Sequence, residues 1–233
     1  MGYLKLLRVR LALAVFAAVS LLFLIFPDID LSVSHLFFHS GRFPLQDAWW
    51  TQLLHFSVGY FILVLMIGVL AVYVVNRLRN SELLDVDGRV VSYLFLVLIV
   101  GAGGIVNLAL KDNFGRARPR DITEFGGTKQ FTPAYVISDQ CAKNCSFSSG
   151  DAAGAFFMIA LARALSRSRR ALAAAVAFGL LVSAARIVSG AHFLSDTIVS
   201  FFIMFFVGDV LYYYLIAPGW APRTAAAIEV PES

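Results

Sequence analysis

The chain has 233 residues, a formal net charge of +4 and a mean hydropathy of +0.78. Hydrophobic residues make up 59% of it and aromatic residues 14%, which is more than a soluble domain of this length carries. This composition excludes an ordinary soluble domain and indicates an integral membrane protein. Nucleic-acid binding gains little support, because the arginine runs lie in short connections beside apolar stretches.

Apolar stretches that suit membrane-crossing helices of about 20 residues recur along the chain. They cover roughly 11–26, 53–76, 90–110, 150–166, 171–188 and 197–216. We therefore expect an all-α fold in which six transmembrane helices form one bundle, with residues 1–233 as a single domain. The first stretch follows a basic start, as a signal peptide does, but Phe26, Pro27 and Asp28 stand where a small-residue cleavage site would be. A retained first helix is favoured over a cleavable signal.

Basic residues outside the clusters discussed below gather at one end of the predicted helices. They are Lys5, Arg8, Arg10, Arg77, Arg79, Arg89, Arg163, Arg167, Arg169, Arg170 and Arg223. The positive-inside rule assigns that end to the cytoplasm. Both termini, with a largely unpacked tail over 217–233, are then cytoplasmic.

The opposite end carries two long polar segments, 27–52 and 111–149, and a short turn around 189–196. Aromatic residues of the first segment, among them Trp49 and Trp50, suit an interfacial position at the depth of the lipid headgroups. We expect this segment to lie along the membrane surface.

Histidines near these segments raise the question of a metal site. His35 and His39 are spaced to share one helix face, but no third ligand in the segment completes a site. We favour interfacial or capping histidines. His55, which stands beside Phe56 at the start of a span, receives the same interpretation, and no metal is expected.

The segment 111–149 is rich in Gly, Pro, Asn, Asp and Thr, which predicts a structured loop rather than another span. Long loops in compact proteins are usually functional. This one contains both cysteines, Cys141 and Cys145. A disulfide between them fits an oxidising compartment outside the cytoplasm, with zinc binding and two free thiols as the alternatives.

Clusters of charged and polar residues stand at the outer ends of the predicted spans. In the first cluster, Lys111 is followed seven residues later by Arg118 and then Pro119, and Arg116 and Arg120 flank that pair. A compact ammonium and a planar guanidinium together suit a tetrahedral dianion. Charges at helix ends also serve as interfacial anchors, so this cluster alone does not decide between the two interpretations.

In the second cluster, Ser149, Gly150 and Asp151 precede the apolar stretch 152–165. The backbone N–H groups of a helix that begins there point at an anion, and Gly150 lets a phosphate oxygen approach the backbone. The alternative is an ordinary helix start with a serine cap.

The third cluster comprises Arg186, His192 and Asp196, between two spans where unpaired charges are unfavourable. Asp196 lies four residues after His192, so its carboxylate can accept a hydrogen bond from one imidazole nitrogen and leave the other as a nucleophile. Arg186 can then hold the phosphoryl oxygens. A purely structural His/Asp pair is the alternative.

Taken together, the clusters resemble the type 2 phosphatidic acid phosphatase superfamily, whose motifs are Lys-x6-Arg-Pro, Pro-Ser-Gly-His and Ser-Arg-x5-His-x3-Asp. The first motif matches from Lys111 to Pro119, and the third matches at Arg186, His192 and Asp196. The resemblance implies a six-helix membrane phosphatase with an outward active site. It also implies hydrolysis of phosphomonoesters or pyrophosphates without a metal or other cofactor, through a phosphohistidine intermediate.

The resemblance assigns a role to each matching residue. The phosphate oxygens are held by Lys111, Arg118, Ser149, Gly150 and Arg186. His192 is the nucleophile, and Asp196 orients it.

Three positions depart from the family pattern. Ser148 replaces the proline of the second motif, Ala185 replaces the leading serine of the third, and Asp151 replaces the second-motif histidine. In the family that histidine protonates the leaving oxygen. An aspartate can do so only while it holds a proton, a form that a neighbouring phosphate dianion and partial desolvation favour. Asp151 as general acid is our hypothesis, and it predicts an acid-shifted rate profile.

The acidic second motif resembles a bacterial branch that includes lipid A 4'-phosphatase-like enzymes. This implies a bacterial inner membrane, with the active site facing the periplasm or exterior. Candidate substrates are lipid A, phosphatidylglycerophosphate, phosphatidic acid and polyprenyl diphosphates. Positive charge on the outer loop favours a multiply charged headgroup, with solvated surface charges as the alternative. The residues concerned are Arg116, Arg120, Lys129 and Lys143.

The alternative function is a catalytically inactive lipid-phosphate binder or carrier on the same fold, in which the altered second motif has removed turnover. The presence of both His192 and Asp196 argues against it, because a binder needs neither a nucleophile nor its orienting carboxylate. A transporter is disfavoured because the charges cluster at one surface rather than at the bilayer midplane.

Overall fold

A computed structural model of the protein describes residues 2–166 and 168–217, and for residues 2–6 and 8 only the backbone. No strand occurs in these ranges, and the all-α prediction is confirmed. Arg167, Arg223 and the predicted tail over 218–233 lie outside the described residues, as do the side chains of Lys5 and Arg8. The long helices are α1 (Gly2–Ile25), α3 (Trp49–Arg79), α4 (Gly88–Leu96) continuing as η2 (Val97–Lys111), α5 (Gly150–Leu165), α6 (Arg169–Val188) and α7 (Leu194–Leu215). The short ones are α2 (Asp28–His35), η1 (Leu83–Asp85), η3 (Pro119–Asp121) and η4 (Thr123–Phe125).

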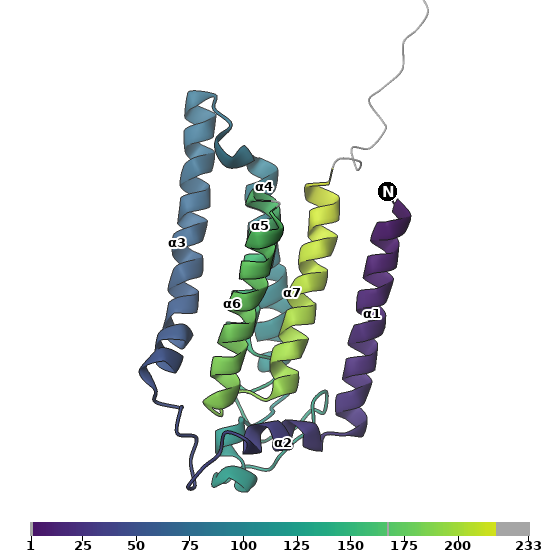
Figure 1. Ribbon diagram of the computed structural model, residues 1–233, viewed down its shortest axis with the longest axis vertical. Coiled ribbons are helices and arrows are strands. Elements are labelled where there is room, and N and C mark those ends of the chain that lie inside the picture. The colour runs from purple at the N-terminus through teal and green to yellow at the C-terminus, as the bar shows by residue number, and fades with distance from the viewer. Residues whose placement is uncertain (1, 167, 218–233) are drawn as a thin grey trace, which may run out of the picture.

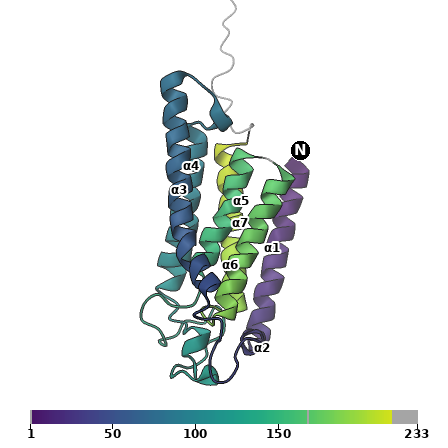
Figure 2. The same ribbon diagram turned by 60° about the vertical axis from the view of Figure 1, so that its left-hand side comes forward.

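The long helices run lengthwise along one axis, as Figures 1 and 2 show from two directions. α2 departs from this direction, because it bends away from α1 by 84° and lies across one end of the bundle. It belongs to the segment 27–52, for which an interfacial position was predicted. One side of α2 is buried against the bundle through Asp30 and Ser34.

Not every predicted span has the length of a membrane span. Among the described residues, four helices are long and apolar enough, namely α3, the continuous helix Gly88–Lys111, α6 and α7. α1 and α2 make a fifth if the bent pair is counted as one span. α5 has 16 residues, which at a rise of 1.5 Å gives about 24 Å, less than the roughly 30 Å of a hydrocarbon core. The six predicted stretches are helical, but six spans are not confirmed.

α5 lies at the centre of the bundle, where it packs against α3, η2, α6 and α7. Its core positions are small, with Ala152, Ala153 and Ala155 fully buried, so neighbouring helices approach closely. A Cβ on Gly179 of α6 would come within 2.2 Å of the Phe156 ring, so only glycine allows this α5–α6 contact. The close packing holds the first turn of α5 in a fixed position relative to α6 and α7.

The helix that ends at Lys111 changes type along its length, because α4 continues as η2. η2 is a π-helix, in which the backbone closes wider turns than in an α-helix, and such turns often occur at functional sites. At its end the N–H of Asp112 donates to the carbonyl of Asn107, five residues earlier, at 3.3 Å. Lys111 is the last residue of η2 and therefore sits at the mouth of the bundle.

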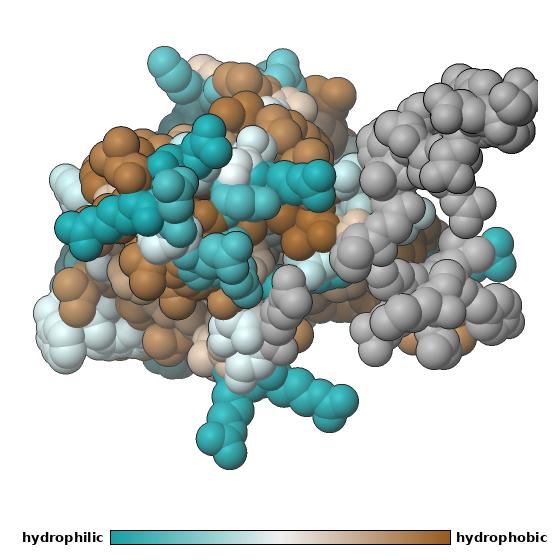
Figure 3. Space-filling model, turned by 90° about the horizontal axis from the view of Figure 1, so that it is seen from above, coloured by the Kyte–Doolittle hydropathy of each residue, from teal (hydrophilic) through white to brown (hydrophobic). Residues whose placement is uncertain are grey.

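Most of the basic residues that do not belong to the three clusters gather at one end of the bundle. α3 ends with Arg77 and Arg79, α4 begins beside Arg89, and α6 begins with Arg169 and Arg170, all at the end where α1 starts. Figure 3 looks onto this end and shows hydrophilic side chains gathered on it. The other end carries α2, the loop after η2 and the turn between α6 and α7. The predicted clustering of basic residues at one end is therefore observed.

Candidate active site

The three clusters come together at the end of the bundle that carries α2. Lys111 ends η2, Ser149 precedes the first turn of α5, and His192 lies in the turn between α6 and α7. Little space separates them, because a Cβ on Gly150 would lie 3.1 Å from Asn107 Oδ1 and 3.4 Å from Lys111 Nζ. Motifs about 80 residues apart in the chain thus form one site, which we call the phosphate site.

Ser149 fixes the start of α5 against α7. Its side chain caps the first turn, and its carbonyl accepts a hydrogen bond from Ser200 Oγ at 2.8 Å. Its own N–H donates to the carbonyl of Asp196 at 3.4 Å. The amides left for an anion are those of Gly150 and Asp151, which lie in the first turn and have no intrahelical acceptor. The backbone donors therefore begin one residue later than the sequence predicts.

His192 is held in one tautomer. Its Nδ1 lies 2.8 Å from the carbonyl oxygen of Ser146, which can only accept, so the proton of the neutral ring sits on Nδ1 and leaves a lone pair on Nε2. Burial lowers the pKa of His192 to about 4, and the nearby charges of Lys111 and Arg118 act in the same direction against the opposing effect of Asp196. The ring is therefore neutral at neutral pH, the form that a nucleophile needs.

Asp196 supports His192 less directly than predicted. Its Oδ2 is 3.5 Å from His192 Nδ1, whereas the same oxygen accepts hydrogen bonds from Ser146 Oγ at 2.6 Å and from the N–H of Phe193 at 2.8 Å. Its Oδ1 accepts from Arg116 at 2.6 Å. Asp196 thus fixes Ser146, and the Ser146 carbonyl fixes the imidazole.

Arg116 does not face a headgroup, and that prediction was wrong. The residue is 1% exposed, and its guanidinium carbon lies 4.2 Å from the centre of the Phe193 ring. Its nitrogens donate to Asp30 Oδ2, Asp196 Oδ1, Ser195 Oγ and the carbonyl of Thr132. Buried charges are tolerated when they are paired in this way. Arg116 is therefore a structural residue that holds Asp196 in place from the interior of the bundle.

Asp30 connects α2 to the buried network around Arg116. It is 1% exposed, its Oδ2 lies 2.8 Å from Arg116, and its Oδ1 accepts the N–H of Ser195 at 2.9 Å. The sequence analysis missed Asp30, which is 86 positions from its guanidinium partner. The one available signal was its acidic residue type, which Asp28 and Asp47 of the same segment share.

Asp151 stands between two nitrogen-bearing side chains. His55 Nδ1 lies 2.9 Å from its Oδ2 in a hydrogen bond, and Arg186 Nε lies 2.9 Å from the same oxygen without a hydrogen-bonding angle. Both contacts favour the carboxylate over the protonated acid, contrary to the surroundings that the general-acid hypothesis assumed. The interpretation of His55 as merely interfacial missed this contact.

Cations converge on the phosphate site with unused donors. Within the described residues, Lys111 makes no hydrogen bond or ion pair, and its electrostatic neighbours include Arg118, Arg186 and Asp151. Arg186 Nε and Ser148 Oγ are buried without a hydrogen-bond partner. Buried polar groups of this kind call for a ligand or water. The ammonium of Lys111 and the guanidinium of Arg186 are donors of the kind that hold a phosphate dianion.

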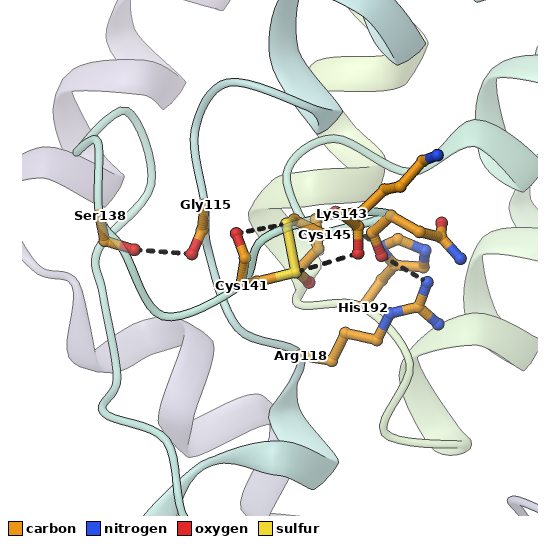
Figure 4. Close-up of a disulfide and its surroundings, with 9 residues drawn as sticks. Gly115, Arg118, Ser138, Cys141, Lys143, Cys145 and His192 are labelled. Atoms are coloured by element: carbon orange, nitrogen blue, oxygen red, sulfur yellow. Dashed lines mark hydrogen bonds between the residues drawn. A yellow bond between two sulfur atoms is a disulfide. The ribbon is translucent and has the colours of Figure 1, made fainter.

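A disulfide joins Cys141 and Cys145, whose Cα atoms are 5.6 Å apart, and this overturns the zinc and free-thiol alternatives (Figure 4). The bridged segment and Ser146, the residue directly after it, each provide one contact to the site. The carbonyl of Asn144 accepts a hydrogen bond from Arg118 at 2.9 Å, and the carbonyl of Ser146 accepts one from His192. The disulfide thus fixes the backbone that positions both side chains.

A basic groove lies next to the site, on the outer face of the loop. Its volume is about 490 Å³, and its charged lining residues are the cations Arg120, Lys129 and Lys143 together with Asp121. Cys141 lines it as well, so the groove and the phosphate site share the bridged segment. Of the four loop cations expected to face a headgroup, these three line the groove and Arg116 does not.

Comparison with known proteins agrees with the motifs. The model of the PAP2 superfamily matches residues 92–219, a range that includes η2, α5, α6 and α7. The chain is 32% identical over 181 residues to a lipid A 4'-phosphatase of Francisella tularensis subsp. novicida (strain U112), covering 76% of this chain and 81% of that protein. It is 32% identical over 197 residues to a lipid A 4'-phosphatase of Rhizobium leguminosarum, covering 74% and 81%.

A third relative, the lipid A 4'-phosphatase of Rhizobium etli (strain ATCC 51251 / DSM 11541 / JCM 21823 / NBRC 15573 / CFN 42), is 32% identical over 190 residues, covering 73% of each chain. No solved structure matches. The family match spans more than half of the sequence and contains the complete first motif, the variant second motif, and the third motif with Ala185 in place of its leading serine. The chain therefore belongs to the PAP2 superfamily.

Proposed function

We propose that this protein is a membrane-bound lipid phosphatase that removes a phosphate monoester from a lipid headgroup, with lipid A as the favoured substrate. The observation that carries the proposal is a neutral, tautomer-fixed His192 close to two cations. In the part of the chain that the structure describes, these are Lys111, which has no ion pair, and Arg186, whose buried Nε makes no hydrogen bond. Relatives named lipid A 4'-phosphatase support the substrate.

In the proposed reaction, the substrate phosphate is held by cations and by the first turn of α5. Lys111, Arg118 and Arg186 bind its oxygens, and the N–H groups of Gly150 and Asp151 add the positive end of the helix dipole. Charge that develops on the equatorial oxygens in the transition state meets donors that are already oriented, which is the largest contribution a site of this kind makes.

His192 then acts as the nucleophile. Its Nε2 attacks phosphorus, the bond to the lipid oxygen breaks, and a phosphohistidine forms, as is general in the superfamily. Water attacks the phosphorus in the second step and releases inorganic phosphate. Asp196 acts through Ser146, because that contact keeps the proton on Nδ1 and the lone pair on Nε2. Loss of either contact allows the ring to rotate or to change tautomer.

We further propose that α1, α3, α4 with η2, α5, α6 and α7 make six crossings of a bacterial inner membrane. The basic end then lies in the cytoplasm by the positive-inside rule, with both termini, and the phosphate site faces the periplasm. The disulfide between Cys141 and Cys145 supports this orientation, because disulfides persist in oxidising compartments. α2, lying across the bundle, suits the membrane surface on the periplasmic side.

The basic groove supports a headgroup with more than one negative charge. Arg120, Lys129 and Lys143 line it beside the phosphate site, so a second phosphate on the same headgroup can meet a second set of cations. Phosphatidic acid has one phosphate and gains nothing from the groove. Phosphatidylglycerophosphate and polyprenyl diphosphates are the other candidates.

The test is release of inorganic phosphate by the purified protein in detergent, with EDTA present. The panel contains lipid A, phosphatidylglycerophosphate, phosphatidic acid and a polyprenyl diphosphate. We expect release from lipid A that is lost in His192→Gln and retained in His39→Gln, a variant of an exposed histidine outside the site. Absence of release from the whole panel, with lipid still bound, favours the inactive binder or carrier.

A further inference from the structure

The family's second-motif histidine is missing from this chain, but an imidazole from another helix occupies its neighbourhood. His55 of α3 contacts Asp151, the residue that stands in place of that histidine, at 2.9 Å. We propose that His55 is the group that gives a proton to the leaving oxygen and that Asp151 is its positioning residue. This inference rests on the proposed phosphatase function and concerns the same site.

Helix packing brings the two residues together. α3 and α5 approach so closely that a Cβ on Gly154 would lie 2.9 Å from Val58 Cγ1 and 3.0 Å from Ile62 Cδ1. His55 precedes Val58 by three residues on α3, and Asp151 precedes Gly154 by three on α5, so each lies about one turn nearer the mouth of the bundle. The tight contact deeper in the bundle therefore fixes the polar contact nearer its mouth.

The hydrogen bond leaves one imidazole nitrogen available. With Asp151 as a carboxylate, Oδ2 can only accept, so the hydrogen is on His55 Nδ1 and Nε2 is the atom that exchanges a proton. The side chain of His55 is 37% exposed and that of Asp151 23%, so the imidazole is the more accessible of the two. Asp151 Oδ2 is already shared with Arg186, which makes it a poor proton carrier.

The two histidines divide the reaction between them. His192 Nε2 forms the bond to phosphorus, the bond from phosphorus to the lipid oxygen breaks, and its electron pair stays on that oxygen. His55 Nε2 supplies the proton that makes the leaving group a neutral alcohol. In the second step water attacks the phosphohistidine, His55 Nε2 takes one proton from the water, and the electron pair of the phosphorus–nitrogen bond returns to His192. Both imidazoles then regain their starting forms.

The rival explanation is that His55 only braces α5 through its hydrogen bond. His55→Asn separates the two roles, because the asparagine amide can still donate to Asp151 but cannot transfer a proton. The comparison uses two substrates that differ in the leaving group. Lipid A releases a poorly leaving sugar alcohol and needs a proton donor, whereas p-nitrophenyl phosphate releases a stabilised phenolate and does not.

We expect His55→Asn to lower kcat for lipid A by about 10²-fold or more, the usual contribution of a general acid, and to change kcat for p-nitrophenyl phosphate by only a few-fold. Turnover of the aryl phosphate shows that the variant is folded. Asp151→Asn should also lower the lipid A rate more than the aryl phosphate rate, since Asp151 positions His55, and His39→Gln should match the wild type.

Two results overturn the inference. One is an unchanged lipid A rate in His55→Asn. The other is an equal loss with both leaving groups, which identifies a structural brace. Failure of the proposed function looks different, because the wild-type protein then releases no phosphate from lipid A at all. A second variant, His55→Ala, gives an independent check: added imidazole should restore part of its lipid A turnover, and no restoration counts against proton transfer.

Discussion

The imidazole of His192 donates to the backbone carbonyl of Ser146, at 2.8 Å, while the carboxylate of Asp196 lies 3.5 Å away. The spacing of the third motif predicts a direct histidine–carboxylate bond. In the structure, Ser146 lies between the two side chains. Its Oγ donates a hydrogen bond to Asp196 Oδ2 at 2.6 Å, and its carbonyl accepts one from the imidazole. Asp196 therefore acts as the centre of a buried polar network that also contains Arg116.

Asp196→Asn should both inactivate and destabilise the protein. The change removes one of the two carboxylates that neutralise the buried guanidinium of Arg116. Breaking a buried pair by removing one partner typically costs about 3–5 kcal/mol. We expect loss of lipid phosphatase activity together with a clear drop in Tm in detergent.

The matched control is Asp209→Asn, at the other end of the bundle. Asp209 also pairs with an arginine at 2.6 Å, but both side chains of that pair are about a third exposed, at 35% for Arg163 and 26% for Asp209. Partly exposed pairs contribute much less to stability. An Asp196→Asn protein with the Tm of Asp209→Asn would contradict the buried network.

Much of the site follows from local spacing, and the rest depends on long-range contacts. Lys111 and Ser149 stand at the ends of apolar stretches, and His192 stands between two of them, so their convergence could be predicted. The contact between His55 and Asp151 joins residues 96 positions apart. It depends on how closely α3 packs on α5, and no local pattern encodes that distance.

Two further features of the site could not be predicted from the sequence, namely the role of a backbone carbonyl and the burial of an arginine. The role of Ser146 rests on its carbonyl, a group that every residue has, so its residue type gave no signal. Arg116 and Arg120 look alike in the sequence, four residues apart. Contacts with Asp30 and Asp196, far away in the sequence, show that Arg116 turns inward, while Arg120 lines the basic groove.

The titration of His192 provides a direct test of its surroundings. Burial lowers its pKa to about 4, below the roughly 6.5 of an unperturbed histidine, so the ring should stay neutral from neutral pH down to that value. The sequence contains four histidines, so NMR of the labelled imidazoles can be assigned with single variants. We expect the resonance lost in His192→Gln to begin shifting only near pH 4.

The same shift has a consequence for stability. Between about pH 6.5 and 4 the unfolded chain binds a proton at this position and the folded chain does not, so stability falls as the pH falls through that window. His192→Gln should reduce this dependence. A His192 resonance that titrates near pH 6.5 would show a solvated ring and would contradict the fixed tautomer.

Reduction of the disulfide should impair catalysis more than stability. The bridge between Cys141 and Cys145 spans four positions, and a loop this short restricts the unfolded chain only slightly. It does fix Asn144 and Ser146, whose carbonyls hold Arg118 and His192. We expect a reductant, or Cys141→Ser with Cys145→Ser, to raise KM and lower kcat several-fold with a small change in Tm. Equal activity of the reduced and oxidised proteins would show that the segment holds its position without the bridge.

If the basic groove binds a second phosphate of the headgroup, its contribution can be measured separately from that of the phosphate site. Neutral substitutions at Arg120, Lys129 and Lys143 remove the groove's positive charge. They leave the phosphate ligands Lys111 and Arg118 in place. We expect the triple glutamine variant to raise KM about tenfold or more for a lipid A that carries two phosphates, since charge-assisted hydrogen bonds are worth about 1.5–3 kcal/mol each.

With a lipid A derivative that carries the 4'-phosphate alone, the same variant should resemble the wild type, because no second phosphate reaches the groove. kcat should change little with either lipid, since groove contacts exist in both the ground state and the transition state. Measuring KM for both lipids at low and at high salt gives a second readout, because the wild-type preference for two phosphates should shrink as salt screens the groove. A preference that survives the triple substitution would assign it to the phosphate site itself.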